Sequence, residues 1–171
     1  QDHYGLMKHL HSEMPVYLSD GAFKVLTVSD IFTPTQFGKH PVCTLNDSKK
    51  VSIGDIVVTP YLMDHSAFGA MAFLIEADGK KVFYTGDFRG HGRKGKLFEK
   101  FLKNPPVGVD ALVMEGTLIG GGREEVRTEC DLEKEIIEIA KKYQGLKFIY
   151  CSGQNIDRLV TFFRAAKQMN H

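Results

Sequence analysis

The sequence predicts an α/β protein, because strands dominate before residue 109 and strands alternate with helices after it. Between 41 and 86 the apolar runs are short, rich in Val, Ile, Phe and Tyr, and separated by turn residues, as in strands. From 109 onward a strand, a helix, a strand and a helix follow one another, which indicates parallel βαβ wiring. The change of composition over 109–128 is therefore the best candidate for a boundary between two units.

Composition narrows the class of protein without naming a partner. The 171 residues are 43% hydrophobic and 25% charged, as expected of a globular chain with a real core. The net charge of +1 gives no argument for nucleic-acid or membrane binding by the whole molecule. Three cysteines without CxxC spacing disfavour a disulfide framework and suit the cytoplasm. No apolar run reaches the roughly 18 residues of a membrane span.

The first elements are short. Residues 1–12 place apolar side chains at helical spacing, and 14–19 has the pattern of a buried strand. The Ser-Asp pair at 19–20 offers two caps for a helix that Pro34 ends near 32, because the residue before a proline resists the helical region. Strands then follow over 41–45 and 51–63, with turns at Asn-Asp and Gly-Asp pairs.

A β-hairpin is the strongest local signal. Two apolar runs, at 70–77 and 81–86, flank the Asp-Gly pair at 78–79, and both turn residues tolerate positive φ. A hairpin brings its two ends together, so we expect His65 and Asp87, 22 positions apart, to lie side by side. An imidazole and a carboxylate held by a rigid sheet make half of a metal site; the alternative is a hairpin whose polar ends merely meet solvent.

The chain after the hairpin alternates loops with regular elements. A glycine-rich basic loop at 89–96 leads to an amphipathic helix at 96–104, and 109–115 is an apolar run typical of a buried strand. A flexible loop follows at 116–125.

Two helices and a strand complete the sequence. Thr128 or Asp131 caps a helix over 132–144, and 147–151 has the composition of a second buried strand. The last helix spans 156–169. Its expected inward residues are Leu159, Phe162, Phe163 and Ala166.

Four residues have the chemistry of metal ligands. Asp2 and His3 are adjacent at the start of the chain, and the hairpin contributes His65 and Asp87. Nitrogen and oxygen ligands without thiolate suit Zn²⁺, with Mn²⁺ as the alternative. On residue type alone the signal is weak, since a lone histidine is more often a hydrogen-bonded structural residue.

The spacing resembles that of the metallo-β-lactamase superfamily and, within it, the ribonuclease J-like hydrolases that contain a β-CASP domain. That family carries an HxHxDH loop, then a single His, then an Asp in a GDF motif. This chain has QDHYGL at 1–6, DHSAFGA at 64–70 and TGDF at 85–88, with 62 positions from His3 to His65. VDALVMEGT resembles the strand that ends in the first acidic motif of the β-CASP domain, at Glu115, and FIYCSGQNIDRLVTFFRAAK resembles a later strand-turn-helix of that domain.

The resemblance implies a divided and incomplete architecture. Residues 1–120 would be a partial metallo-β-lactamase αββα sandwich without its first strands and HxH pair, and 121–171 the truncated beginning of a β-CASP-type parallel α/β domain. Two further ligands would precede Gln1, and the remaining histidines would follow His171, so the isolated chain is expected to be inactive. Two departures concern subfamily and substrate: Glu-Gly-Thr replaces the family's Glu-Ser-Thr, and Arg-Gly-His follows GDF in place of a Lys.

The family's roles carry over residue by residue. His65 would bind the first of two zinc ions, Asp2 and His3 the second, and Asp87 would bridge both. Asp2 would also orient the attacking water. Glu115 would pair with a downstream histidine that protonates the leaving oxygen, unless it is a solvent-facing strand end.

Substrate contacts are expected close to the metal ligands. The basic loop that begins at Arg89 has the charge to hold a phosphate backbone, although exposed basic loops are common. Ser152 and Asn155 lie at a strand-to-helix turn that favours an anion, although capping alone explains both. Asp64 would either accept from the His65 imidazole or cap its loop.

The expected function is a zinc-dependent RNA-processing nuclease that cleaves phosphodiesters in the cytoplasm. One alternative is a small-molecule hydrolase acting on a thioester, lactone or β-lactam, and another is a catalytically silent RNA-binding homologue. The expected partner is RNA, or single-stranded nucleic acid generally, with no membrane partner; a homodimer is left open.

Overall fold

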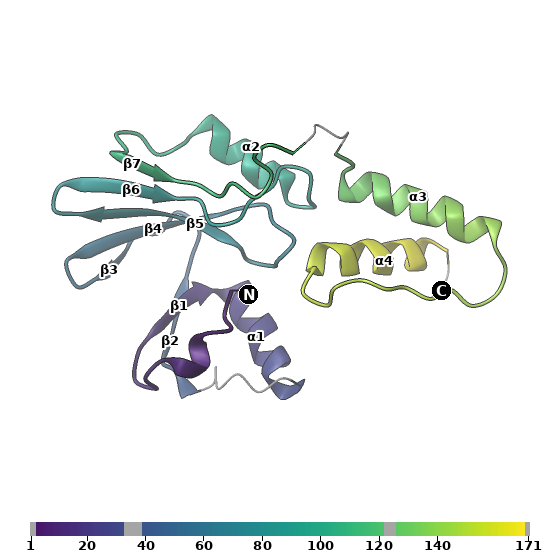
Figure 1. Cartoon of the computed structure of the whole chain (residues 1–171), viewed down its shortest axis with the longest axis horizontal. Coiled ribbons are helices and arrows are strands. Elements are labelled where there is room, and N and C mark those ends of the chain that lie inside the picture. The colour runs from purple at the N-terminus through teal and green to yellow at the C-terminus, as the bar shows by residue number, and fades with distance from the viewer. Residues whose placement is uncertain (1–2, 33–38, 122–125, 170–171) are drawn as a thin grey trace.

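The computed structural model describes residues 3–32, 39–121 and 126–169. Figure 1 shows a body built of two sheets, with a pair of helices, α3 and α4, to one side of it. Within the body, helix α2 covers a five-stranded sheet, a two-stranded sheet lies beyond its other face, and helix α1 packs on the smaller sheet. The predicted α/β class is confirmed, and the layers follow the expected α, β, β, α order.

The smaller sheet and α1 form the N-terminal part. Strands β1 (Val16–Ser19) and β2 (Val42–Leu45) pair in parallel, and helix α1 spans Asp20–Phe32. Ser19 ends β1 and caps α1, because its Oγ accepts from the Ala22 N–H at 3.1 Å. The helix expected over 1–12 is a short 3₁₀ turn in the described residues, η1 (Met7–His9). Pro34 lies outside the described residues.

The larger sheet has the strand order β3-β4-β5-β6-β7. Its strands are β3 (Val51–Ile53), β4 (Ile56–Leu62), β5 (Met71–Ala77), β6 (Lys80–Tyr84) and β7 (Ala111–Val113). The predicted hairpin is confirmed: Ala77 pairs with Lys80, and the turn between them has φ of 50° at Asp78 and 70° at Gly79. Within the described part of this sheet the pairs are antiparallel except for β6 and β7, which run parallel.

Alternation along the hairpin separates two apolar layers. Ala72, Leu74 and Phe83 point to one face and are buried there beneath α2 (Gly95–Lys103). The rings of Phe83 and Phe101 stack with centroids 5.3 Å apart, which anchors the helix to the sheet. Intervening residues, among them Met71, Phe73 and Tyr84, line a pocket on the opposite face. One face of the hairpin therefore packs in the core, and its other face lines the pocket between the two sheets.

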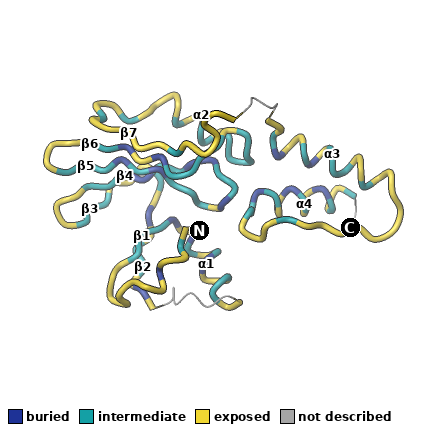
Figure 2. The backbone as a smooth tube through the Cα atoms, in the orientation of Figure 1, coloured by how far each residue is buried: buried dark blue, intermediate teal, exposed yellow. Residues whose placement is uncertain are grey.

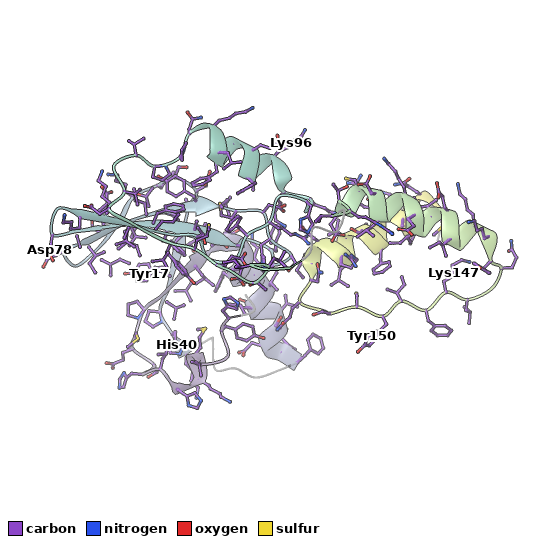
Figure 3. The ribbon with its side chains drawn as sticks, turned by 45° about the horizontal axis from the view of Figure 1, so that its top comes forward. Tyr17, His40, Asp78, Lys96, Lys147 and Tyr150 are labelled. Carbon is purple, nitrogen blue, oxygen red and sulfur yellow. The ribbon has the colours of Figure 1, made fainter. Side chains whose placement is uncertain are left out.

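Helices α3 (Glu129–Lys142) and α4 (Ile156–Gln168) pack against each other. The expected cap at Thr128 is confirmed, and it forms a reciprocal capping box with Asp131. The prediction of a buried strand at 147–151 is wrong, because these residues form no strand. Phe148 and Tyr150 are 94% and 102% exposed. Tyr150 points away from the helices in Figure 3. Among the described residues no strand pairs with this segment, so its apolar character alone does not make it a strand.

Two further burial expectations are wrong for related reasons. Among the described strands β7 is a sheet edge beside β6, and Leu112 at its centre is 61% exposed. Figure 2 draws β7 in the colour of exposed residues. On α4 the buried positions are Asp157, Thr161 and Ala165. Of the expected inward residues, Leu159 and Phe163 are exposed, and Phe162 and Ala166 are only partly buried. The inward face of α4 is thus largely polar, and this polarity governs how the helices attach to the body.

No helix in the described part of the chain is long and apolar enough to cross a membrane.

We expect Phe83→Ala to lower the free energy of unfolding by about 3–5 kcal/mol, because it removes a buried ring and leaves a cavity beneath α2. Phe163→Ala is the matched control, and it should change stability by less than about 0.5 kcal/mol because that ring is exposed. Urea unfolding followed by circular dichroism measures both. Equal losses in the two variants would contradict the assigned core.

Candidate metal centre

The two ends of the hairpin segment meet, as the sequence predicted. The Arg89 N–H donates to the Asp64 carbonyl at 2.7 Å, so the residue before His65 is bonded to a residue just after Asp87. Gly86, immediately before Asp87, has φ of 56°, and the chain turns there as it leaves β6. His65 and Asp87 line the same pocket.

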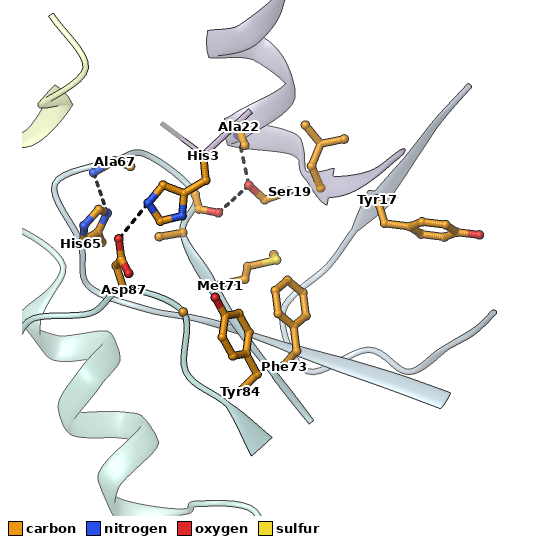
Figure 4. A pocket seen from close by; sticks show the side chains of 14 residues that line it. His3, Tyr17, Ser19, Ala22, His65, Ala67, Met71, Phe73, Tyr84 and Asp87 are labelled. Atoms are coloured by element: carbon orange, nitrogen blue, oxygen red, sulfur yellow. Dashed lines mark hydrogen bonds and ion pairs between the residues drawn. The ribbon is translucent and has the colours of Figure 1, made fainter. Parts of the chain in front are cut away.

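His3 and Asp87 form the central pair of this site. His3 Nε2 lies 3.1 Å from Asp87 Oδ2, and Figure 4 shows the two side chains facing each other. Two ligands about 2.0–2.1 Å from one tetrahedral Zn²⁺ are separated by roughly 3.3 Å, so this spacing suits a shared ion. His3 lies in the N-terminal segment, which is not part of the larger sheet. The His3 side chain is 69% exposed.

His65 lies on the wall of the same pocket but makes a different contact. Its Nδ1 accepts from the Ala67 N–H at 3.2 Å. Coordination through Nε2 requires the proton on Nδ1, so metal binding there would break this bond. In the part of the chain that the structure describes, no three His, Cys, Asp or Glu side chains gather closely enough to hold a metal. Asp2, the fourth predicted ligand, lies outside the described residues.

The pocket itself lies between the two sheets and has a volume of about 200 Å³. Its lining combines polar and aromatic side chains from β1, β5 and β6 with the loop around Gly69. Ser19 closes one side, because its Oγ donates to the Gly69 carbonyl at 2.7 Å. A Cβ on Gly69 would lie 2.2 Å from that Oγ, so only glycine permits this approach.

Glu115 supports the backbone beside Asp87. Its Oε1 accepts from the Phe88 N–H at 2.7 Å, and Oε2 accepts from the Thr117 hydroxyl at 2.9 Å. Glu115 is therefore neither a free strand end nor placed against the described metal ligands. It fixes the residue that follows Asp87. Its expected partnership with a downstream histidine stays a prediction.

Asp64 acts as a loop cap. The side chain is fully buried and accepts from the Gly92 and Lys94 N–H groups at 2.7 and 3.1 Å. Asp64 was expected either to accept from the His65 imidazole or to cap its loop, and these hydrogen bonds from backbone N–H groups correspond to capping. A Cβ on Gly92 would lie 2.3 Å from Asp64 Oδ1, so the loop approaches too closely for any residue but glycine.

The basic loop is directed into the protein instead of toward the pocket. Arg89 Nη2 lies 2.6 Å from Asp157 Oδ2, and Lys94 Nζ lies 2.5 Å from Asp157 Oδ1. Arg93 Nη2 pairs with Glu133 Oε2 at 2.5 Å. Three of the loop's charges are thus neutralised by buried carboxylates on α3 and α4. This corrects the expectation of a free basic patch: Arg89 has a structural role here, and its predicted contact with substrate stays untested.

The predicted anion-binding turn also has a structural explanation. Asn155 Oδ1 accepts from the Arg158 N–H at 3.0 Å and caps α4. Ser152 is exposed, and its Oγ accepts from the Gln154 N–H at 3.3 Å. Both contacts stabilise the turn into α4, as the capping alternative requires.

The three buried carboxylates of the helices remain ionised. Burial raises the pKa of Asp157, but hydrogen bonds from Lys94 and Arg89 lower it by more, so this pKa falls below the ordinary value of 3.8. Burial likewise opposes ionisation of Glu129 and Glu133. Hydrogen bonds from Arg158 to Glu129 and from Arg93 to Glu133 bring the pKa of each below 4.5. Each carboxylate is ionised because a cation contacts it.

The acids of this cluster, Glu129, Glu133 and Asp157, were missed from the sequence. The signal was present as two i, i+4 pairs: Glu129 with Glu133 on α3, and Asp157 with Thr161 on α4. A run of cations at 89–94 had the complementary charge. Apolar spacing alone does not indicate that the acids of these helices pair with the cations at 89–94.

We expect stability to fall as the pH drops below about 4.5. The folded pKa values of Asp157, Glu129 and Glu133 are depressed, so their contribution is complete above the unfolded values and is lost as the pH falls through the folded ones. Urea midpoints measured between pH 7 and pH 3 test this. The double variant Asp157→Asn/Glu133→Gln should show a flatter acid limb. An unchanged slope would contradict the assigned ion pairs.

Comparisons with known proteins give one partial relative and a shared fold. No protein-family model matches the chain. Over 69 residues, 40% of the chain, it is 39% identical to cleavage and polyadenylation specificity factor subunit 3 of Dictyostelium discoideum. The match spans 8% of that protein's length.

Solved structures extend the likeness to nearly the whole chain. A protein of unknown function from Enterococcus faecalis matches with a TM-score of 0.72 and 22% identity, covering 94% of this chain and 41% of that one. Zn²⁺-bound PqqB from Methylobacterium extorquens matches with a TM-score of 0.45 and 20% identity, covering 66% of this chain and 41% of that one, which is too distant to carry an argument. The chain therefore shares its mixed α/β fold with the Enterococcus protein.

Proposed function

We propose that this chain carries part of the active site of a metal-dependent hydrolase with the metallo-β-lactamase fold. The observation that carries the proposal is the pair His3 Nε2–Asp87 Oδ2 at 3.1 Å, in a pocket that His65 also lines. A histidine nitrogen and a carboxylate oxygen at this spacing could supply two of the ligands of a zinc ion. The order of the layers, with the pocket between two sheets, supports the same proposal.

The more specific proposal is a ribonuclease J-like RNA-processing nuclease with two zinc ions. Zinc would supply a hydroxide nucleophile at neutral pH and offset the charge on the attacked phosphate. His3 and Asp87 would hold one ion, with Asp2 as a further ligand and the residue that orients the water. His65 would contribute to the other ion once its Nδ1 carries the proton.

The chain's own residues would keep this geometry fixed. Glu115 binds the Phe88 N–H and so limits movement of the backbone next to Asp87. The bond between Arg89 N–H and the Asp64 carbonyl holds the His65 loop beside it. These contacts restrain the backbone beside Asp87 and His65, while the His65 ring would still have to give up its bond from the Ala67 N–H before Nε2 binds a metal.

A polynucleotide substrate is supported by the curated relative, whose name refers to cleavage and polyadenylation. The structure limits which side chains would contact phosphates, because Arg89, Arg93 and Lys94 are already paired with carboxylates. Lys96, at the start of α2, remains exposed (Figure 3). Phosphate contacts would therefore come from exposed cations before Arg89 and Arg93, whose side chains are only 14% and 12% exposed.

We expect Asp87→Asn to weaken zinc binding by more than about tenfold, because replacing a ligand should cost at least as much as losing one of its supporting contacts. Competition with a chromophoric chelator measures the affinity. Asp78→Asn is the matched control, since Asp78 lies at the opposite end of the same hairpin (Figure 3) and asparagine accepts its positive φ. Equal affinity in the two variants would remove Asp87 from the site.

Substrate class is tested with labelled single-stranded RNA and with nitrocefin, each in the presence of zinc and with Asp87→Asn as the blank. We expect zinc-dependent cleavage of RNA and none of nitrocefin by the protein that contains the complete ligand set. Cleavage of nitrocefin alone would establish the small-molecule hydrolase instead. Zinc binding without either activity would favour the silent homologue.

A further inference from the structure

Asp157, in the first turn of α4, contacts both loops of the candidate metal centre. Its backbone N–H donates to the Ser66 carbonyl at 3.3 Å. Its carboxylate accepts from Arg89 Nη2 and Lys94 Nζ at 2.6 and 2.5 Å, and from the Arg93 N–H at 3.2 Å. The residue is only 4% exposed, so water does not compete for these bonds.

These contacts lie close to the candidate ligands along the chain. His65 immediately precedes Ser66, and Asp87 lies two residues before Arg89. The Arg89 N–H is itself bonded to the Asp64 carbonyl, so the two loops already form one unit. Asp157 closes that unit from the side of α4, and a movement of this helix would displace both loops together.

The attachment of the two helices to the body is mainly electrostatic. Helices α3 and α4 pack chiefly against each other. Outside that packing, the Glu129 N–H donates to the His91 carbonyl at 3.1 Å, and Arg93 pairs with Glu133. Buried, hydrogen-bonded ion pairs tolerate little displacement, because an unpaired buried charge is costly. The relative position of helices and loops is therefore tightly specified where Asp157 lies.

We propose that Asp157 is a positioning residue, which locks the first turn of α4 onto the loops that carry His65 and Asp87. Docking of the α3–α4 pair then sets the geometry of the pocket, and a ligand or partner that shifts these helices alters the site. The metal-binding consequence rests on the function proposed above. The mechanical link between helix and loops stands on the contacts alone.

Hydrogen exchange measured by mass spectrometry on the full chain tests the link. In Asp157→Asn, amides of 64–70 and 86–92 should exchange at least about tenfold faster, while those of β5 keep their wild-type rates. Glu133→Gln is the matched control: it removes a buried ion pair from the same interface but contacts neither Ser66 nor Arg89. It should leave both loops unchanged. Equal acceleration by the two variants would overturn the proposal.

A milder variant keeps the test decisive if Asp157→Asn does not fold. Lys94→Gln removes one contact to Asp157 while the Lys94 N–H can still donate to Asp64, so exchange in the same two loops should rise by a smaller factor. The link would be refuted if exchange in both loops kept its wild-type rate in folded Lys94→Gln and, where that variant also folds, in Asp157→Asn. Zinc affinity is measured in parallel. Failure of the protein that contains the complete ligand set to bind zinc would refute the proposed function, whereas the exchange comparison would still decide the role of Asp157.

Discussion

A single backbone hydrogen bond, from the Arg89 N–H to the Asp64 carbonyl, organises the candidate centre. The hairpin of β5 and β6 brings its ends near each other, but a pair of strands leaves the chain beyond its last rung free to diverge. This bond joins the segment between β4 and β5, just before His65, to the segment after β6, just beyond Asp87. A short and buried backbone contact thus converts a common structural motif into a site with fixed spacing.

The loop after Asp87 packs against Asp64, the residue that accepts this hydrogen bond. Asp64 accepts two N–H groups from this loop, and Gly92 allows the backbone to lie against the carboxylate. Leaving either N–H unpaired in the interior would cost about 1–3 kcal/mol, so the arrangement strongly favours one loop conformation. In the glycine-rich loop that the sequence suggested for phosphate contact, Gly92 is needed for close packing against Asp64.

Sequence reasoning succeeded where the determining residues were neighbours. The Asp-Gly turn predicted the hairpin of β5 and β6, and Thr128 predicted the start of α3. It failed where the outcome depends on distant partners. The run at 147–151 has the composition of a strand but no strand to pair with among the described residues, and the destination of the cations at 89–94 depends on acids that follow 40 to 68 positions later.

The polar character of the interface between loops and helices has a physical rationale. An apolar surface would bury comparable area but would tolerate sliding, because the hydrophobic effect has no direction. Three carboxylates of the helices face the guanidinium and ammonium groups of the loop and accept only one register, since a shift leaves a charge unpaired in the interior. These helices adjoin the loops of the candidate metal centre, where a single register keeps the spacing of its side chains fixed. The charges of the loop then serve the site indirectly, by holding its walls in place.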